Sequence, residues 1–351
     1  MIRIRARAPG RRALALGLPT AWGAAAVAYK LACPLAQQDG LGARIVSSAV
    51  FFAVGTGLVL HARRVLVREL KQANEVAGAA QGTLLRPLPP RVGGLRVAAA
   101  QFSADRGAGV GGDLYEVIAT EHGVRAVMGD VRGHGIGAIG TVAAVLGSFR
   151  EAAHDEPDLG RVLRRLDRAL ARHLRERARA AGPDSPVAEE FVTVLLLEIG
   201  REGEVRALNC GHPWPYRLLE ARVEPLSGAE PLPPLGPFPL PAELPAVGCP
   251  ALRPGEGLLL HTDGAEDARD AHGRFFPLVA VLAEALSAGV RTPQALLGAV
   301  FTRLLKHTAG QPADDVALLI LHNEPQPRCA PSAARGTARA ATTHPQPTNR
   351  L

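Results

Sequence analysis

Four short segments of the chain place an aspartate beside glycine or beside a second aspartate, and each adjoins a run of strand-forming residues. They contain Asp113, Asp130, Asp263 and the pair Asp314 and Asp315. We expect each segment to mark the end of a strand, where rigid backbone holds the carboxylate and glycine lets a ligand approach. Several hard oxygen donors that converge on one place suit Mg²⁺ or Mn²⁺. Zinc fits less well, because no His or Cys cluster has zinc-ligand spacing.

An Asp–Gly pair alone is ordinary turn chemistry, so the interpretation depends on the order of the segments. Six motifs follow one another: GGDLYE (111–116), GDVRGHG (129–135), FVTVLLLEI (191–199), NCGHPWPY (209–216), LLLHTDGAEDA (258–268) and ADDVALLIL (313–321). The series resembles the SpoIIE-like bacterial branch of the protein phosphatase 2C (PPM) superfamily, over about residues 80–322. GGDLYE is also similar to the GGDEF signature of diguanylate cyclases, but that family does not carry the later motifs.

The resemblance implies a fold and a set of metal ligands. The fold is α+β, an αββα sandwich of two antiparallel sheets flanked by helices, with the metal site at one edge. Asp130 is then expected to bridge two Mn²⁺ or Mg²⁺ ions, and Asp113 and Asp263 to hold one ion each, directly or through water. The Val131 carbonyl is a further candidate ligand, and Asp314 takes the position of the last family ligand. Asp130 and Asp263 are the candidate catalytic residues.

Electrostatics explain why phosphate hydrolysis needs such a site. A phosphomonoester dianion repels hydroxide, and its hydrolysis builds negative charge on the attacking and leaving oxygens. Two metal ions about 3.5–4 Å apart can bind the phosphate, activate a bridging water and stabilise both oxygens. We therefore expect direct hydrolysis by the activated water, without a covalent phosphoenzyme.

Several residues within the motifs keep two interpretations each. Asp315 is the alternative to Asp314, and the sequence leaves that choice open. His134 is either a general acid or a loop residue whose ring contacts backbone. His212 also lies in a matched motif without an assigned role, and Thr193 is expected to pack beside the site.

Two positions depart from the family pattern. Glu116 stands where aspartate is usual, which keeps the charge and lengthens the side chain by one methylene. Arg132 stands where a small residue is usual, and it either binds substrate phosphate or points into solvent.

Two apolar stretches near the N-terminus, about 13–33 and 45–62, are each just long enough to cross a bilayer. Arginine clusters precede the first stretch and follow the second, which predicts a transmembrane hairpin with both ends in the cytoplasm. The alternative is a cleaved signal peptide formed by the first stretch.

The remaining organisation follows from composition. Residues 63–91 are expected to form a linker helix and a proline-rich turn, 92–323 the phosphatase domain, and 324–351 a disordered polar tail. The linker helix either couples the membrane to the domain, pairs with a second copy in a homodimer, or is a plain spacer.

The predicted function is removal of phosphate from phosphoserine or phosphothreonine on a protein, for which the resemblance suggests an anti-anti-sigma (STAS) substrate. The place of action is a bacterial cell membrane, with the catalytic domain in the cytoplasm. The net charge is +7, and much of the excess comes from the arginine clusters that flank the apolar stretches. Membrane topology explains these clusters, so we expect no nucleic-acid partner. The alternative function is a catalytically weak, membrane-anchored signalling scaffold.

Overall fold

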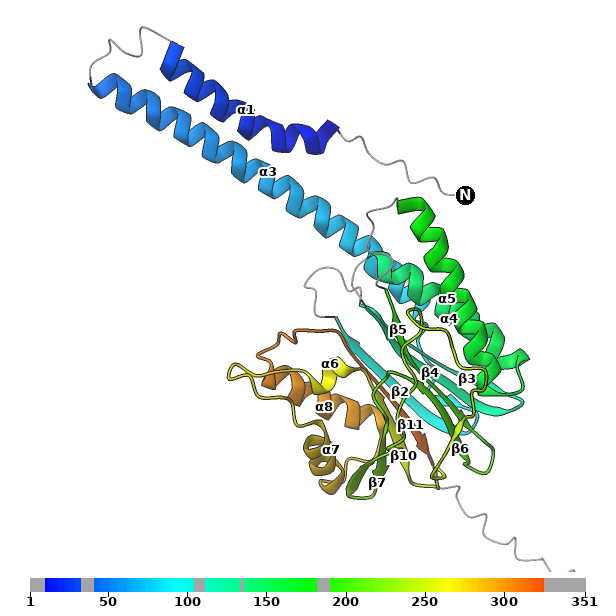
Figure 1. The fold of residues 1–351 in the computed structure, drawn as a ribbon. Helices are drawn as coiled ribbons and strands as arrows, with labels where there is room; N and C mark the ends of the chain where they lie inside the picture. Colours follow the sequence, from blue (N-terminus) through cyan, green and yellow to red (C-terminus); the bar gives the residue numbers. More distant parts are fainter. Residues whose placement is uncertain (1–9, 33–40, 104–110, 133–135, 182–189, 325–351) are drawn as a thin grey trace, which may run out of the picture.

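Two antiparallel β-sheets form the centre of the fold in the computed structural model (Figure 1). The structure describes residues 10–32, 41–103, 111–132, 136–181 and 190–324. In spatial order, the six-stranded sheet contains β1 (Arg91–Val92), β2 (Leu95–Phe102), β11 (Val316–Asn323), β10 (Gly257–His261), β7 (Tyr216–Leu219) and β8 (Arg222–Pro225). The five-stranded sheet contains β3 (Asp113–Thr120), β4 (Gly123–Val131), β5 (Val192–Ile199), β6 (Val205–Cys210) and β9 (Val247–Cys249).

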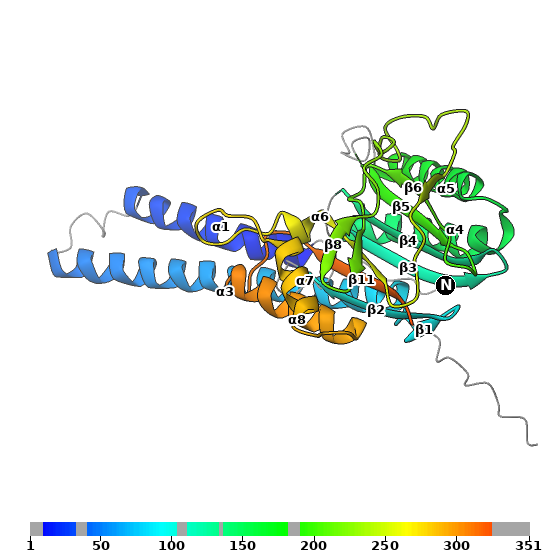
Figure 2. The same cartoon turned by 90° about the horizontal axis from the view of Figure 1, so that it is seen from below.

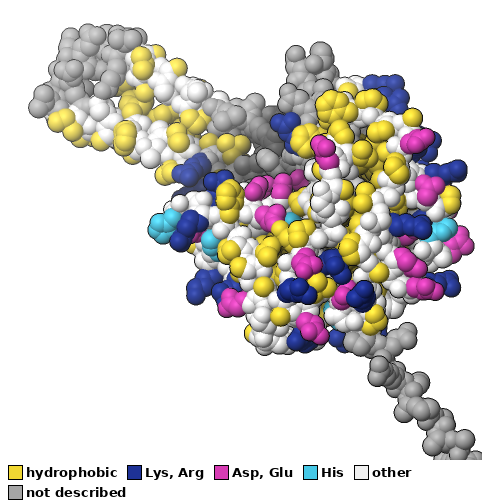
Figure 3. Space-filling view, turned by 60° about the horizontal axis from the view of Figure 1, so that its bottom comes forward, with side chains coloured by type: hydrophobic (Ala, Val, Ile, Leu, Met, Phe, Trp, Pro, Cys, Tyr) yellow, Lys and Arg dark blue, Asp and Glu magenta, His cyan; other side chains and the backbone are white. Residues whose placement is uncertain are grey.

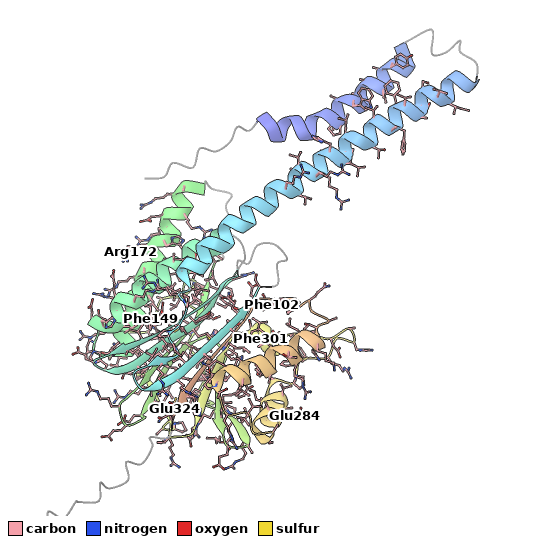
Figure 4. The ribbon with its side chains drawn as sticks, turned by 180° about the vertical axis from the view of Figure 1, so that it is seen from behind. Phe102, Phe149, Arg172, Glu284, Phe301 and Glu324 are labelled. Atoms are coloured by element: carbon pink, nitrogen blue, oxygen red, sulfur yellow. The ribbon has the colours of Figure 1, made fainter. Side chains whose placement is uncertain are left out.

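Helices cover the outer faces of both sheets, which gives four layers with three apolar cores between them. The five-stranded sheet is covered by α4 (Ile136–Asp155) and α5 (Leu159–Ala181), and the six-stranded sheet by α7 (Leu278–Ser287) and α8 (Pro293–His307). Figure 4 labels Phe149 of α4 and Phe301 of α8, which belong to the two outer cores. The middle core lies between the sheets and includes Met128 and Leu260, both fully buried.

The amphipathic pattern of α5 determines how it packs. Its leucines and valines at helical spacing are buried against α4 and the sheet as far as Leu170, and Leu174 is half-buried. Arginines such as Arg161 and Arg172 lie on the outer face. Leucine and valine at helical spacing, with arginines on the opposite side, are the sequence pattern that predicts such a covering helix.

A pair of helices extends away from the sandwich (Figures 1 and 2). They are α1 (Gly10–Ala32) and α3 (Leu41–Leu84), which run side by side and contact each other through aromatic residues. The indole Nε1 of Trp22 donates a hydrogen bond to the Phe51 carbonyl over 3.2 Å, and the two rings lie 5.4 Å apart. By length and composition, one span among the described residues, Ile45–Arg68, could cross a membrane.

The second apolar stretch and the linker helix form one uninterrupted helix of 44 residues, α3. This is physically reasonable, since no proline or glycine pair interrupts the chain between them. The tail from residue 325 onward, predicted to be disordered, lies outside the described residues.

The predicted α+β fold with two antiparallel sheets is confirmed, but one detail of strand direction is wrong. Not every aspartate segment ends a strand: Asp113 is the first residue of β3, and Asp314 precedes β11. The error arises because a short motif does not show whether the strand lies before or after its aspartate. In an antiparallel sheet, the start of one strand lies beside the end of the next, so the segments still gather at one edge.

Candidate metal centre

Asp113 and Asp130 face each other across neighbouring strands. The register of β3 and β4 pairs Asp113 directly with Asp130, and Asp113 is only 1% exposed. The backbone of this corner is tied together further, because the Val131 amide donates to the Gly112 carbonyl over 3.1 Å. The five-stranded sheet therefore presents two carboxylates at its edge.

The six-stranded sheet brings its own carboxylates to the same place. Asp263 follows β10 and begins a short helix, α6 (Asp263–Glu266), while the Asp314 segment leads into β11, the neighbour of β10. Thr262 joins the two sheets: its hydroxyl donates to Asp113 Oδ2 over 3.3 Å and accepts from the Ala317 amide over 3.0 Å.

The glycine of the Thr-Asp-Gly segment is required by close packing. A Cβ on Gly264 would lie 1.9 Å from the Asp315 carbonyl oxygen, so no larger residue fits there without a backbone shift. A Cβ on Gly111 would lie 2.5 Å from Asp315 Oδ2. Both glycines thus allow their segments to approach the Asp314–Asp315 pair.

The two residues of that pair have different surroundings. Asp315 accepts a hydrogen bond from Ser103 Oγ over 2.9 Å and another from the Gly112 amide over 3.2 Å, one to each carboxylate oxygen. Asp314 is exposed, and its Oδ1 accepts from the Asp315 amide over 2.8 Å. Asp315 therefore fastens the segment that carries Asp113.

Asp113, Asp130, Asp263, Asp314 and Asp315 are referred to below as the acidic cluster. Burial, followed by the negative charges of the cluster, raises the pKa of Asp113 well above its ordinary value of 3.8. The same causes, in the same order, raise the pKa of Asp130 to about 7. Burial, followed by the charge of Asp314, also raises the pKa of Asp263. The cluster is thus a place where negative charges repel one another in a partly buried setting.

Among the residues that the structure describes, positive side chains do not offset this repulsion at three members of the cluster. Within the described ranges, Asp113, Asp130 and Asp263 form no salt bridge with lysine or arginine. In those same ranges, no group of three His, Cys, Asp or Glu side chains is already arranged as a complete metal site, so water would have to supply part of the coordination of a bound ion. The donor chemistry fits Mg²⁺ or Mn²⁺, because all donors are oxygens and their excess negative charge calls for a cation. Figure 3 shows acidic side chains gathered below the helical extension.

Comparison with protein families decides the assignment. Residues 120–324, more than half of the chain, match the family described as Stage II sporulation protein E (SpoIIE). The chain belongs to the SpoIIE family. This confirms the resemblance that the six motifs carry.

Solved structures agree with this SpoIIE-family assignment at the level of the fold. The SiaA-PP2C domain of Pseudomonas aeruginosa matches with a TM-score of 0.58 and 19% identity, over 74% of this chain and 98% of that one. The RsbU and RsbW domains of a Mycobacterium tuberculosis protein match with a TM-score of 0.54 and 24% identity. That match covers 67% of this chain and 62% of the other, so the chain spans about three fifths of that relative. No curated protein sequence matches the chain. Family and fold together support a protein-serine/threonine phosphatase, the class that the motifs predicted.

The family motifs also contain a buried polar group behind the acidic cluster. Thr193 pairs with Asp130 across β5 and β4, and its hydroxyl accepts a hydrogen bond from the Asp130 amide over 3.2 Å. The same hydroxyl lies 2.9 Å from Nδ1 of His212, which is 4% exposed. Burial, together with the nearby His261 ring, lowers the pKa of His212 to about 3, so the ring is neutral. Thr193 therefore does more than pack beside the site.

The two departures from the SpoIIE-family pattern have local partners. Glu116 accepts hydrogen bonds from Arg150 of α4, whose guanidinium also donates to the Leu84 carbonyl at the end of α3. Arg132 lies over the Phe191 ring, with its guanidinium carbon 5.3 Å from the ring centre. His134 lies outside the described residues.

Sequence reasoning missed the supporting residues of the centre. Thr262 lies within a matched motif but was given no role, and Ser103 lies outside the six motifs, since a hydroxyl beside a strand end is common. Asp315 was considered only as an alternative ligand, whereas its contacts with Ser103 and Gly112 tie together two segments that are more than 200 residues apart. Such contacts depend on the packing of distant strands, which the sequence pattern does not display.

Proposed function

We propose that this chain hydrolyses phosphoserine or phosphothreonine on a protein substrate, with two Mn²⁺ or Mg²⁺ ions held by the acidic cluster. The observation that carries the proposal is the convergence of carboxylates from both sheets. The pKa values of Asp113, Asp130 and Asp263 are raised, and within the described ranges none of the three pairs with lysine or arginine. A site built only for stability has no reason to gather like charges in this way.

The proposed ligands are Asp113, Asp130, Asp263, Asp314 and the Val131 carbonyl, with Asp130 shared between the ions. Bound ions would supply the positive charge that holds the phosphate, activates water and stabilises the leaving oxygen. Asp314 is preferred to Asp315 because both oxygens of Asp315 already accept hydrogen bonds, whereas Asp314 is exposed beside Asp263.

The chain's own residues have the task of holding these carboxylates in place. Thr262 fixes Asp113 through its hydroxyl, and Asp315 fixes the backbone before Asp113 through Gly112. Glycine at positions 111 and 264 keeps the segments close. Preorganisation of this kind lowers the free energy needed to arrange the site when substrate binds.

The biological setting is proposed from the apolar helices and the family. The antiparallel contact of α1 with α3 supports the membrane hairpin, and with it a bacterial cell-membrane location and a cytoplasmic domain over 92–323. The similar structures include RsbU and SiaA domains, which supports a regulatory protein as the partner. That this partner is a phosphorylated protein of the STAS type is proposed from the family resemblance. The length of α3 supports pairing with a second copy as a further proposal.

The test is Mn²⁺-dependent phosphate release from p-nitrophenyl phosphate and from a phosphorylated STAS protein. We expect activity in the wild type, and a loss of at least about 100-fold in both Asp130→Asn and Asp263→Asn, since each removes a charged ligand. Asp155→Asn, at an exposed position on α4, is the control and should retain activity.

Full activity in both aspartate variants would overturn the metal assignment. Tight Mn²⁺ binding by calorimetry with no turnover on either substrate would favour the scaffold function. Capture of a phosphoryl group on the protein during turnover would contradict direct hydrolysis by water.

A further inference from the structure

The turn after β6 is built to hold one histidine in place. Asn209 brackets His212: its side-chain Nδ2 donates to the His212 carbonyl over 2.8 Å, and its Oδ1 accepts from the His212 amide over 2.9 Å. Between them, Gly211 has a φ of +69°, a conformation that favours glycine, and a Cβ there would lie 2.7 Å from Pro234 Cγ. The Asn-Cys-Gly-His segment therefore specifies both the position and the direction of the His212 ring.

The ring is directed at the strand that carries Asp130. Nδ1 of His212 lies 2.9 Å from the Thr193 hydroxyl, which accepts from the Asp130 amide over 3.2 Å and lies 3.5 Å from the Asp130 carbonyl oxygen. If the neutral ring carries its proton on Nδ1, it donates to the hydroxyl; if on Nε2, the hydroxyl donates to Nδ1. Both tautomers fix the same hydroxyl, so Thr193 is held from one side by His212 and from the other by Asp130.

This arrangement lies on the junction of the two sheets. His212 follows the five-stranded sheet, and its neighbour His261 ends β10 of the six-stranded sheet, two residues before Asp263. Nε2 of each ring is buried and makes no hydrogen bond of good geometry among the described residues, although the backbone of His261 lies near the His212 ring. The well-formed polar contact of the His212 ring is therefore the one from Nδ1 to Thr193. A ring needed only to fill space could be apolar. A buried ring with one directed hydrogen bond instead restricts where its partner can lie.

We propose that His212 and Thr193 are positioning residues that fix the backbone of Asp130 in the geometry needed to bind the metal ions. The inference deepens the proposed function and rests on it. His212 touches neither substrate nor ions in this role, and its effect passes through Thr193. Support of this kind around metal ligands changes metal affinity or activity by about 10–100-fold when it is removed.

The test compares substitutions that keep the polar atom with substitutions that keep only the shape. Thr193→Ser retains the hydroxyl and Thr193→Val removes it. His212→Asn keeps a polar atom near the place of Nδ1, and His212→Leu does not. Thr308→Val is the control, because Thr308 is also buried but its hydroxyl bonds the Leu304 carbonyl of α8.

Three quantities are measured on the full-length chain, purified in mild detergent. They are the Mn²⁺ dissociation constant by calorimetry, the kcat and KM for p-nitrophenyl phosphate, and the thermal midpoint without metal. We expect Thr193→Val and His212→Leu to weaken Mn²⁺ binding by about 10-fold or more. The Ser and Asn variants should stay within about 3-fold of wild type, and the control should bind Mn²⁺ as wild type does. The double variant Thr193→Val/His212→Leu should be no worse than the more impaired single variant, because both interrupt one chain of contacts.

Each result decides between positioning and packing. Wild-type Mn²⁺ affinity in both shape-only variants would overturn the proposal. Equal impairment of the polar and the shape-only variants, or losses that multiply in the double variant, would also overturn it, since packing would then explain the effect. A wild-type chain that binds no Mn²⁺ would instead refute the proposed function, and this inference with it.

Discussion

Charge repulsion in the acidic cluster predicts that the metal-free protein is destabilised as the pH rises. The ordinary pKa of an aspartate is 3.8, and in the folded protein the pKa of Asp130 is raised to about 7. Burial is the largest cause of this rise, followed by the negative charges of Asp263, Asp314 and Asp315. Between these two pH values the folded state holds a proton that the unfolded state has lost. Folding is therefore favoured at low pH, and this contribution disappears as the pH rises through 7.

The size of the effect follows from the difference between the two pKa values. Full ionisation of Asp130 in the folded state corresponds to about 4 kcal/mol, and solvent at its partly exposed carboxylate reduces this to about 2–4 kcal/mol. For a domain of this size, that is a difference in thermal midpoint of about 6–12 °C. Asp130→Asn removes the charge. The thermal midpoint of this variant, measured relative to that of wild type, should therefore rise by about 6–12 °C between pH 4 and pH 8.

The assay is thermal unfolding of wild type and Asp130→Asn in chelator at several pH values, followed by repetition with Mn²⁺. Comparing the two proteins is necessary because buried histidines such as His212, with its lowered pKa, stabilise the folded state as the pH rises. These histidines are the same in both proteins, so their contribution cancels. With Mn²⁺ at pH 8, wild type should instead have the higher thermal midpoint of the two proteins, since wild type is then stabilised by the bound ion. A constant difference between the two metal-free proteins from pH 4 to 8 would refute the electrostatic reasoning.

Three further predictions address single contacts. Asp314→Asn should weaken Mn²⁺ binding in calorimetry by about 10-fold or more, whereas Asp315→Asn should mainly lower the thermal midpoint, because Asp315 fastens backbone. Arg125→Met should cost about 3–5 kcal/mol in denaturant unfolding, because it removes the buried partner of Glu198 and leaves that carboxylate only the more distant Arg206, at 3.6 Å. Adding Glu198→Gln should recover part of this loss, and no recovery would contradict the pairing. Gly264→Ala should destabilise the domain by about 1–3 kcal/mol, since its Cβ would overlap the Asp315 carbonyl, and an unchanged thermal midpoint would contradict that close approach.

The sequence predicts most strands of this fold because their residues are buried on both faces. The apolar runs Gly257–His261 and Val316–His322 each predict a strand. Strand β10 has the first set of bounds, and β11 extends the second by one residue to Asn323. Continuous apolar runs between turn residues are easily recognised. Strand β3 was not predicted, because Asp113 and Glu116 interrupt its apolar pattern. Glu116 is nevertheless buried at 7% exposure, since Arg150 pairs with it.

The candidate site could be predicted as a set of residues but not as a geometry. The motifs identify the carboxylates because their types and order are specific. Which strand faces which, and therefore that Asp113 lies opposite Asp130, depends on a register that no single segment contains. The separate tasks of Asp314 and Asp315 depend on Ser103 and Gly112, which only the folded chain brings beside them.

The position of the acidic cluster at the junction of the two sheets links metal binding to the packing of the sandwich. Asp113 and Asp130 belong to the five-stranded sheet, whereas the charges that most raise the pKa of Asp130 come from Asp263, Asp314 and Asp315, on segments of the other sheet. The repulsion therefore acts across the middle core and tends to separate the sheets at this edge. An ion bound by carboxylates of both sheets would replace that repulsion by attraction. At a free ion concentration of about 100 times the dissociation constant, binding would add about 2.7 kcal/mol to the free energy of unfolding. A site of this kind forms only when the sheets are packed together. A substitution in the middle core that disturbs this packing should therefore weaken metal binding, although it alters no metal ligand.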